Sequence, residues 1–508
     1  MIAALRGHLL TRWQQLAAAW AIRHVRRGFV GTILITVGSF TPAYLPQASP
    51  FWPLMRWAGL DNPVFKVLGT LLVLGGVGLL VSAWFRLRPW GDGRDVELYR
   101  HVRHWAVLMI WGAPFLLAPP IFSHDAYSYA AQGWLVHNGI SPYEQGPGVL
   151  PGGFADQVAW VWRFTPAPYG PLSLQINHLL VDLAGFDPYL SALLMRIPAL
   201  VGVGLIGIFL PRLAHRYRVD PARAAWFGTL NPVLVIDFIG GAHNDSLMMG
   251  LVVLALWITR VVGWGWVPGA VLVGIAASVK QPALLVAYAL PLVHRPWRSL
   301  QWGETLDIIA RAMAGVGLAV GTFAGISWAT GLGFGWLNAV NVPGLVVTVS
   351  PFTVLGQAFS YLFDWVGWAS GAEMAVRISR SIGLIISVVT VGVLALTTAR
   401  RKPLNFLAYS YLVIAFCAPA LHSWYVLWGG LLLPLARPSQ RMIRVAVWTT
   451  VVLLSYAAVN LAVRNGFLSL GVAALGLYYW QSHNEDRKAR RRLRRIDAKE
   501  PREQSDNH

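Results

Sequence analysis

Apolar stretches about 20 residues long recur along this chain of 508 residues, and they constrain its fold more than any other feature. One of them, VLGTLLVLGGVGLLVSAWF at positions 67–85, contains no charged residue. A helix of that length crosses the hydrocarbon core of a bilayer while its backbone hydrogen bonds stay internal. Charged residues make up 12% of the chain, which is roughly half the share of a soluble domain. We therefore expect an all-α polytopic membrane protein.

The formal charge of +19 is concentrated in short connections and near the two ends of the chain. That placement is typical of the cytoplasmic side of membrane proteins, so nucleic-acid binding is not the expected reason for the charge. Residues 1–27 predict a basic cytoplasmic N-terminus. Residues 482–508, which include DRKARRRLRR, predict a basic cytoplasmic tail close to anionic membrane lipids.

The region between these ends, residues 28–481, is predicted to be one transmembrane domain with about 12–14 helices. Two segments poor in Lys and Arg, residues 122–187 and 331–376, are expected to be large outer loops. Within the first, PLSLQINHLLVDLAG (171–185) is short and partly polar, so it should lie along the outer interface. No separate soluble domain is indicated, and the sequence does not show the inverted repeat of secondary transporters.

Polar residues gather where apolar runs end, and the first such cluster is SHDAYSY, with His124, Asp125 and Tyr127. Ionisable groups at membrane-embedded positions are costly, so each is a candidate for function. A carboxylate beside aromatic rings, such as Asp125, is suited to accept a proton from a bound hydroxyl. The alternative is that Ser-His-Asp only caps the helix that follows.

A second cluster, GGAHNDSLMMG, brings His243, Asn244 and Asp245 together between two apolar runs. Capping of the next helix would explain Asn or Asp alone. Two glycines and three polar groups at one depth exceed what a cap requires, which favours a site. Asp237, two turns earlier, is expected to be a structural partner of a polar neighbour.

Lys280 interrupts a long and almost uncharged stretch, where an unpaired cation costs about 3 kcal/mol. Pro282 after Gln281 predicts that one helix ends here and another begins. We expect Lys280 to be a cation awaiting an anionic ligand, with Arg196 as a second positive group. The alternatives are snorkelling of Lys280 to the outer headgroups and an ion pair between Arg196 and an outer acid.

The fourth cluster, HSWYVLW, places His422, Trp424 and Tyr425 at a predicted outer hairpin tip. Its aromatic residues can equally be part of an interfacial belt. All four clusters fall at the predicted outer ends of helices.

Several other sequence features do not predict a catalytic role. Gly202, Gly204 and Gly207 match GxGxxG but lie inside an apolar span, so they are expected to pack helices. The spacing of His, Asp and Asn fits no standard metal-ligand set, and no metal or other cofactor is expected. The single cysteine, Cys417, excludes an internal disulfide.

The combined chemistry predicts a transferase that takes a sugar from a lipid phosphate. Cations at a membrane-embedded cleft suit the phosphate, aromatic rings suit the faces of sugars, and the carboxylate suits activation of an acceptor hydroxyl. A transporter or flippase of a lipid-linked sugar is the alternative from another class. It would place polar residues at the bilayer midplane and on both sides.

The order of SHDAYSYAAQG, NGISPYEQGP, PAPYGPL, GGAHNDSLMMGL, VKQPALL and HSWYVLW resembles the actinobacterial polyprenol-phosphate-mannose-dependent α-1,6-mannosyltransferases. The resemblance extends over residues 30–480. It implies an integral-membrane glycosyltransferase of the GT-C type in the plasma membrane. The implied reaction moves mannose from polyprenyl-phosphate-mannose to a lipid-anchored mannan, such as lipomannan, on the outer face. The residues alone leave open another polyprenyl-phosphate sugar, such as arabinose or glucose.

The resemblance also implies roles for individual residues. Asp125 would be the catalytic base of a single inverting displacement that needs no covalent enzyme intermediate and no metal. His124 stands where members of the family often have Arg, which weakens a phosphate-binding role at this position. The residues expected to bind the substrates are His124, Tyr127, Arg196, His243, Asn244, Asp245, Lys280, Gln281, His422, Trp424 and Tyr425.

Overall fold

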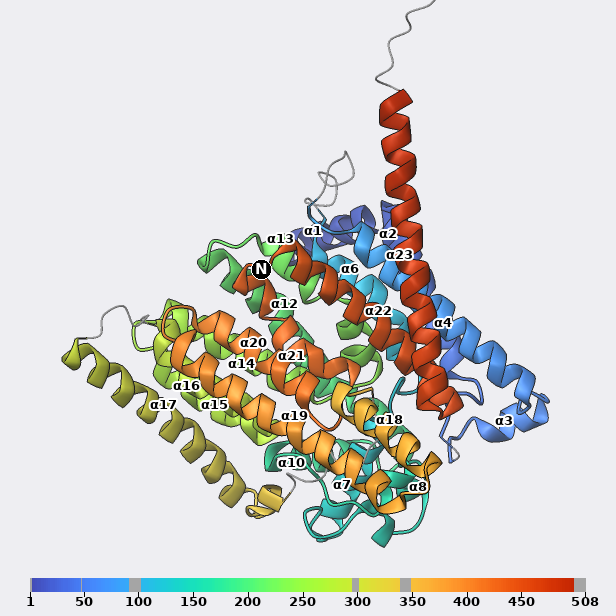
Figure 1. The fold of residues 1–508 in the computed structure, drawn as a ribbon, viewed down its shortest axis with the longest axis horizontal. Helices are drawn as coiled ribbons and strands as arrows, with labels where there is room; N and C mark the ends of the chain where they lie inside the picture. The colour runs from blue at the N-terminus through green and yellow to red at the C-terminus, as the bar shows by residue number, and fades with distance from the viewer. Residues whose placement is uncertain (1, 47, 91–101, 295–300, 339–348, 498–508) are drawn as a thin grey trace, which may run out of the picture.

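A computed structural model describes residues 2–46, 48–90, 102–294, 301–338 and 349–497 (Figure 1). Residues 339–348 of the second predicted outer loop and residues 498–508 of the predicted tail lie outside the described residues. The described parts of the chain form helices and connections without a β-strand.

The helices of the first half are α1 (Ile2–Ala21), α2 (Arg23–Ser39), α3 (Trp52–Trp57), α4 (Pro63–Arg86), α6 (His104–Gly112), η1 (Ala113–Leu116), α7 (Asp125–His137), η2 (Pro147–Val149), α8 (Gly153–Asp156), α9 (Trp160–Arg163), α10 (Pro171–Leu183), α11 (Pro188–Leu194), α12 (Arg196–Arg216), α13 (Pro221–Phe227), η3 (Leu234–Gly240) and α14 (Asp245–Val261). Those of the second half are α15 (Trp266–Val279), η4 (Gln281–Leu284), α16 (Leu285–His294), α17 (Trp302–Ala329), α18 (Pro351–Trp365), α19 (Ala369–Thr397), α20 (Pro403–Cys417), η6 (Ser423–Tyr425), α21 (Val426–Gly430), η7 (Leu433–Ala436), α22 (Gln440–Val463) and α23 (Gly466–Asp497).

Within the described ranges, five helical segments are long and apolar enough to cross a membrane: α4, α11 with α12, α17, α19 and α22. A sixth is possible if η3 and α14, which are bent by 114° relative to each other, form one broken span. The fold is therefore that of a polytopic helical membrane protein, as the sequence predicts. The predicted 12–14 crossings exceed this number because several apolar runs form helices of only 10–17 residues, such as α15 and α20.

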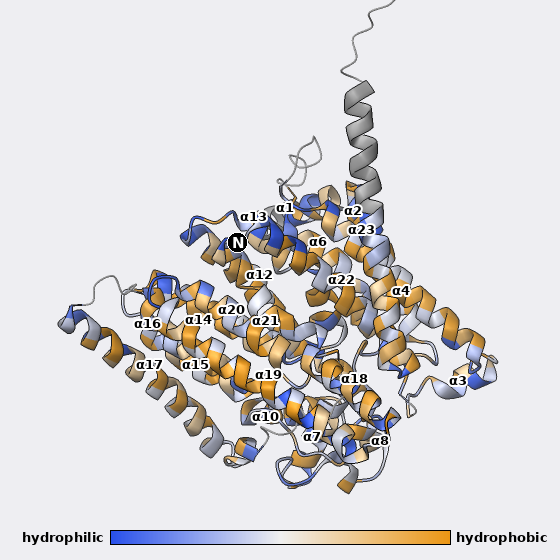
Figure 2. Cartoon of the chain, viewed as in Figure 1, coloured by the Kyte–Doolittle hydropathy of each residue, from blue (hydrophilic) through white to orange (hydrophobic). Residues whose placement is uncertain are grey.

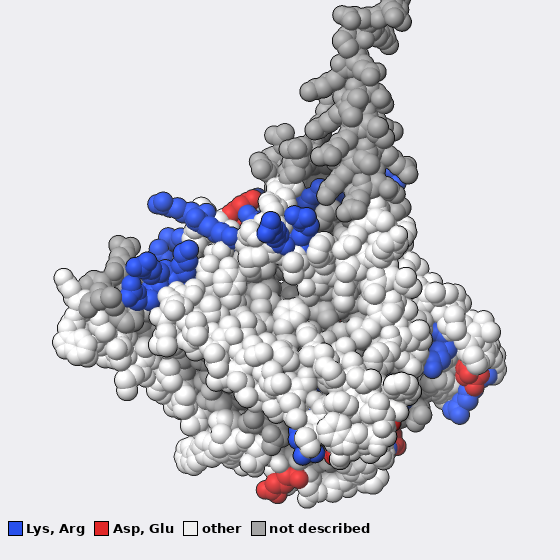
Figure 3. All heavy atoms as spheres, viewed as in Figure 1, with Lys and Arg blue, Asp and Glu red and all other residues white. Residues whose placement is uncertain are grey.

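The two ends of the helical body differ in composition. Figure 1 shows the N-terminus and the far end of α23 at one end, whereas α7, α8 and α10 lie at the opposite end. Hydrophobic residues dominate the helices between them, and hydrophilic residues are more frequent toward both ends (Figure 2). On the face shown in Figure 3, Lys and Arg side chains gather at the end that carries the N-terminus.

Close packing between α12 and α14 depends on glycine. A Cβ atom on Gly202 would collide with the backbone of Ser246, and a Cβ atom on Gly250 would lie 2.7 Å from the carbonyl oxygen of Gly202. Gly204 instead faces open space, and Gly207 would only touch the Thr229 side chain. Gly202 is therefore a helix-packing residue, as the sequence predicts, and the match to GxGxxG has no nucleotide-binding meaning.

A small second core supports the end of the molecule that holds α7 and α10. It buries Ala126, Tyr129, Leu174 and Met195 together with Ala242, which precedes the His-Asn-Asp cluster. α10 packs directly on α7 and is not among the candidate spans. This agrees with the prediction that residues 171–185 do not cross the membrane.

Candidate active site

The Asp125 carboxylate is the accessible acid of the site. Asp125 is the first residue of α7, and its backbone N–H donates to the Ser123 hydroxyl at 2.9 Å. The Asp125 side chain does not cap the helix, so the capping interpretation is wrong for this residue. About 18% of its side chain remains exposed, whereas the neighbouring His243 is fully buried. Asp125 can therefore reach a bound molecule.

Three stacked rings lie beside this carboxylate. Nδ1 of His243 is 3.5 Å from Oδ2 of Asp125. The His243 ring stacks on Trp424 with 3.6 Å between ring centroids, and His422 stacks on Trp424 with 4.4 Å. The second and fourth sequence clusters therefore meet at Asp125, although the described residues offer neither ring nitrogen of His243 a hydrogen-bond partner.

Lys280 is paired inside the protein. Its Nζ donates to Oδ2 of Asp245 at 2.8 Å, and Trp428 Nε1 donates to Oδ1 of the same carboxylate at 2.8 Å. Nζ also lies over the Tyr425 and Tyr169 rings, 4.9 and 5.6 Å from their centroids. The sequence predicts that Lys280 is a cation awaiting an anionic ligand, but it already has a partner in the protein, because the fully buried Asp245 of the second cluster forms an ion pair with it.

Backbone geometry explains why Lys280 enters the site. α15 ends at Val279, and Lys280 adopts an extended conformation with φ −155° before η4 begins. The predicted helix break before Pro282 is confirmed. The Gln281 side chain donates from Nε2 to the Pro168 carbonyl at 3.1 Å, which fastens the loop containing Tyr169 beside Lys280.

Asn244 also makes side-chain contacts across the site. Its Nδ2 donates to the Ser173 hydroxyl at 3.2 Å, and its Oδ1 accepts from the Tyr129 hydroxyl at 3.4 Å. No side-chain bond from Asn244 caps α14, so capping does not explain this residue. Asp237 accepts from the Ser423 hydroxyl at 2.6 Å, which confirms its predicted role as a structural partner.

Arg196 holds the backbone of the break between η3 and α14. Its Nε donates to the Ile239 carbonyl at 3.1 Å, and its Nη2 donates to the Ala118 and Gly240 carbonyls at 2.6 and 3.1 Å. In the described part of the chain Arg196 makes no ion pair with an acid, so that alternative is wrong. Its Nη1 has no hydrogen-bond partner there. At most this one nitrogen is free to contact an anion.

His124, just before α7, and Tyr127, in its first turn, contact each other at the start of the helix. Nε2 of His124 is 3.3 Å from the Tyr44 carbonyl oxygen. The two rings contact each other edge to face with 5.8 Å between centroids. Within the described residues the buried Tyr127 hydroxyl has no hydrogen-bond partner. Whether either residue contacts a substrate stays a prediction.

The charge states of the groups outside the spans follow from burial. Burial raises the pKa of Asp125 to about 6, against the Ser123 hydrogen bond and the Lys280 cation, which lower it. Burial and, to a smaller extent, the nearby Lys280 cation lower the pKa of His422 to about 3. Burial likewise lowers the pKa of His124 to about 4. Near pH 7 both histidines are therefore neutral and offer hydrogen bonds rather than charge.

Two residues with left-handed backbone conformation precede the two motif clusters. Phe122 has φ 62° and Ala242 has φ 56°. That conformation costs a non-glycine residue roughly 1–2 kcal/mol. Such strain persists only where the surrounding packing imposes it and often accompanies functional sites. Phe122 lies three residues before Asp125, and Ala242 directly precedes His243.

Sequence reasoning missed three contributors to the site. Tyr169 and Trp428 complete the aromatic surroundings of Lys280, and Ser173 binds Asn244. Tyr169 lies in PAPYGPL and Trp428 in HSWYVLW, so both stretches were recognised but not these residues. A separate group of His137, His178 and Asp182 has the atoms to hold a metal ion. It connects α7 and α10 away from Asp125 through side chains that are about one-third exposed.

Comparison with known proteins covers most of the chain. A family model described as "Alpha-(1->6)-mannopyranosyltransferase, N-terminal domain" matches residues 25–295, and one described as "MptB C-terminal domain" matches residues 352–474. No solved structure is significantly similar.

Individual relatives extend over similar lengths. A probable α-(1→6)-mannopyranosyltransferase of Mycolicibacterium smegmatis is 30% identical over 83% of this chain and 80% of its own length. α-(1→6)-Mannopyranosyltransferase A of Mycobacterium tuberculosis is 31% identical over 85% of this chain and 84% of its own. The enzyme of the same name from Corynebacterium glutamicum is 31% identical over 65% and 69%.

Proposed function

Because the chain belongs to the α-(1→6)-mannopyranosyltransferase family and is a glycosyltransferase, we propose that it transfers mannose from a polyprenyl-phosphate donor to a growing α-1,6-mannan. The observation that carries the proposal is the partly exposed Asp125 carboxylate beside His243 and in the field of Lys280. The names of the relatives specify the sugar and the linkage. The membrane setting and the cation near the acid support a lipid-phosphate donor.

Asp125 acts as the general base in this proposal. The acceptor hydroxyl oxygen bonds to the anomeric carbon of mannose as the bond from that carbon to the phosphate oxygen breaks. Asp125 takes the hydroxyl proton, and polyprenyl phosphate departs with the electron pair. One displacement inverts the anomeric centre, so a β-linked donor gives an α-linked product. Asp245 is poorly suited to this role because Lys280 and Trp428 occupy its two oxygens.

Lys280 stabilises the departing phosphate. An ammonium group has three donors, and Asp245 engages one of them, so Lys280 can bind an anion while staying anchored. Positive charge placed where negative charge develops is usually the largest contribution to catalysis. A neutral His422 adds a hydrogen bond, and Trp424 and Tyr425 line the path of the sugars. The positive charge comes from the protein itself, so we expect EDTA to leave the rate unchanged.

The proposed orientation follows the distribution of charge. The end that gathers Lys and Arg on the face in Figure 3 would be cytoplasmic, together with both termini. The end with α7 and α10 would then face outward and present Asp125 to an extracytoplasmic acceptor. In a lipoglycan-producing cell that acceptor is a lipid-anchored mannan.

The test uses purified full-length protein in detergent, polyprenyl-phosphate-mannose and a short α-1,6-mannoside. Asp125→Asn should lower the transfer rate by about 10²–10⁴-fold, which is the usual contribution of a general base. Asp364→Asn, at the end of α18, removes an acid of the same kind elsewhere and should retain the rate. Transfer by Asp125→Asn at the wild-type rate would show that another group is the base. Transfer only from an arabinosyl or glucosyl donor would refute the assigned sugar. Movement of the lipid across vesicles without transfer would refute the enzyme.

A further inference from the structure

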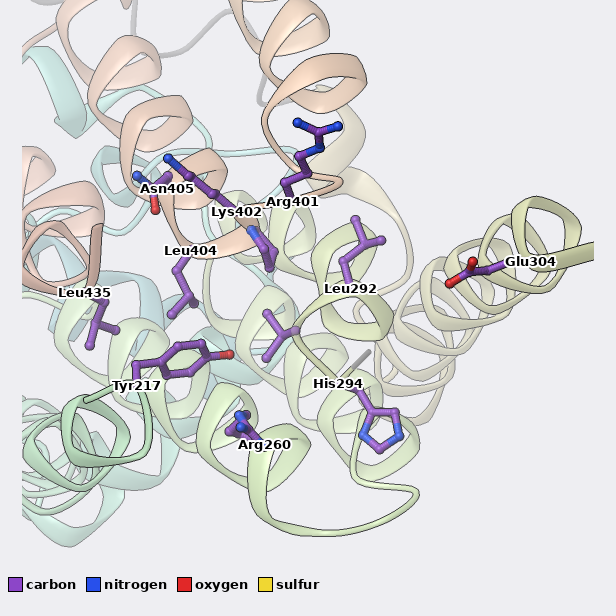
Figure 4. A pocket seen from close by; sticks show the side chains of 12 residues that line it. Tyr217, Arg260, Leu292, His294, Glu304, Arg401, Lys402, Leu404, Asn405 and Leu435 are labelled. Carbon is purple, nitrogen blue, oxygen red and sulfur yellow. The ribbon is translucent and has the colours of Figure 1, made fainter. Parts of the chain in front are cut away.

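A basic pocket of about 610 Å³ is lined by none of the residues of the candidate active site. Figure 4 shows its lining side chains, which come from the ends of α12, α14 and α16, the starts of α17 and α20, the connection from α19 to α20, and η7. Leu292, Val293, Leu404 and Leu435 provide an apolar wall. The pocket therefore has an apolar wall and a polar rim.

The rim carries excess positive charge. Arg260, Arg401 and Lys402 line the pocket, and Glu304 is the one acid among its lining residues. In Figure 4 Glu304 stands apart on α17, away from Arg401 and Lys402. No carboxylate in the described ranges pairs with any of the three cations. Three exposed cations around one opening repel each other unless an anion lies between them.

Two uncharged features also favour an anion. α20 begins at Pro403, its cap position carries no side-chain hydrogen bond, and its first turn lines the pocket. The positive end of the helix dipole and the free N–H groups of a first turn attract phosphate. The Tyr217 hydroxyl is buried in the wall and, among the described residues, has no hydrogen-bond partner. This hydroxyl can donate a hydrogen bond to a phosphate ester oxygen.

We propose that this pocket binds the phosphate headgroup of an anionic membrane phospholipid from the cytoplasmic leaflet. The basic side chains belong to connections that positive-inside placement assigns to the cytoplasm, so the pocket opens at headgroup depth. Basic pockets between transmembrane helices on that side are suited to anionic headgroups. The apolar wall of Leu292 and Leu404 receives the glycerol and the first acyl carbons, which a free phosphate ion would leave uncovered. This binding site is independent of the transfer reaction.

The experiment measures lipid binding by the full chain in a neutral detergent. Native mass spectrometry and thermal unfolding follow titration with phosphatidylglycerol, phosphatidylcholine or inorganic phosphate. The wild type should bind phosphatidylglycerol at least ~10-fold more tightly than phosphatidylcholine, with a higher Tm. Arg401→Gln/Lys402→Gln should lose that preference. Arg441→Gln/Arg444→Gln, which removes two exposed arginines at the start of α22, should keep it.

Each other outcome overturns the proposal. Equal binding of the two lipids by the wild type would show that the pocket does not recognise anionic headgroups. Equal loss in both double variants would assign the effect to general surface charge. An equal rise in Tm with inorganic phosphate would make this a site for free phosphate. If Arg401→Gln/Lys402→Gln does not fold, Arg260→Gln on the opposite rim replaces it, and an unchanged lipid preference there refutes the proposal.

Discussion

Lowering the pH from 7 to 5 should reduce the mannosyl transfer rate about tenfold, because Asp125, the proposed base, can accept the proton of the acceptor hydroxyl only in its ionised form. Burial raises the pKa of Asp125 to about 6. At that pKa about nine-tenths of the carboxyl groups are ionised at pH 7 and about one-tenth at pH 5. An unperturbed Asp, with a pKa of about 3.9, would stay more than about nine-tenths ionised at both pH values. Activity is thus present above the folded-state pKa and is lost as the pH falls through it.

A second perturbation tests the cause of that midpoint. The Lys280 cation lowers the pKa of Asp125. Replacing Lys280 by Met should therefore move the midpoint of the pH–rate profile to higher pH, in addition to any loss of rate. Lys66→Met removes an exposed lysine at the start of α4 and should leave the midpoint in place.

The assay records initial rates at low donor concentration between pH 4.5 and 8 at constant ionic strength. Thermal unfolding at each pH separates loss of chemistry from loss of fold. A rate that stays level from pH 7 to pH 5 would refute the assignment of a buried carboxylate as the base. A midpoint that moves to lower pH in Lys280→Met would refute the electrostatic coupling between the two groups.

Three further substitutions test the packing and pairing of the site by thermal and denaturant unfolding. Asp245→Asn should destabilise the protein by about 3–5 kcal/mol because it leaves a buried cation unpaired. Adding Lys280→Met should recover much of that stability. Equal stability of the single and double variants would contradict the pairing. Gly202→Ala should lower the free energy of unfolding by about 1–3 kcal/mol through overpacking against α14. Gly204→Ala, which faces open space, should be neutral or stabilising. Equal Tm changes would show that α12 and α14 do not pack as described. Arg196→Gln should cost at least ~3 kcal/mol because several charged hydrogen bonds to backbone carbonyls are lost; an unchanged Tm would leave only a ligand-binding role for this residue.

The sequence by itself determined the class of fold and the identity of the most informative residues. Runs of apolar residues require helices in a bilayer, since no other arrangement of one chain satisfies every backbone group without closing a barrel. The free-energy cost of burying a charge identified individual residues, because an acid or a lysine inside an apolar membrane segment is expensive unless it is paired or has a function. Asp125, Asp245 and Lys280 were found in this way, and so was the helix break at Pro282.

Only the tertiary structure decided which of these groups pair. Asp245 begins α14 and Lys280 lies in the break between α15 and η4, so periodicity along one helix cannot show that their side chains meet at 2.8 Å. The sequence therefore left Lys280 without a partner, and it could not separate the buried Asp245 from the partly exposed Asp125. Partner choice depends on how helices pack across the molecule, and burial then sets the charge state of each group. Local sequence determines where a helix breaks, whereas the packing of distant segments determines which acid stays free to act.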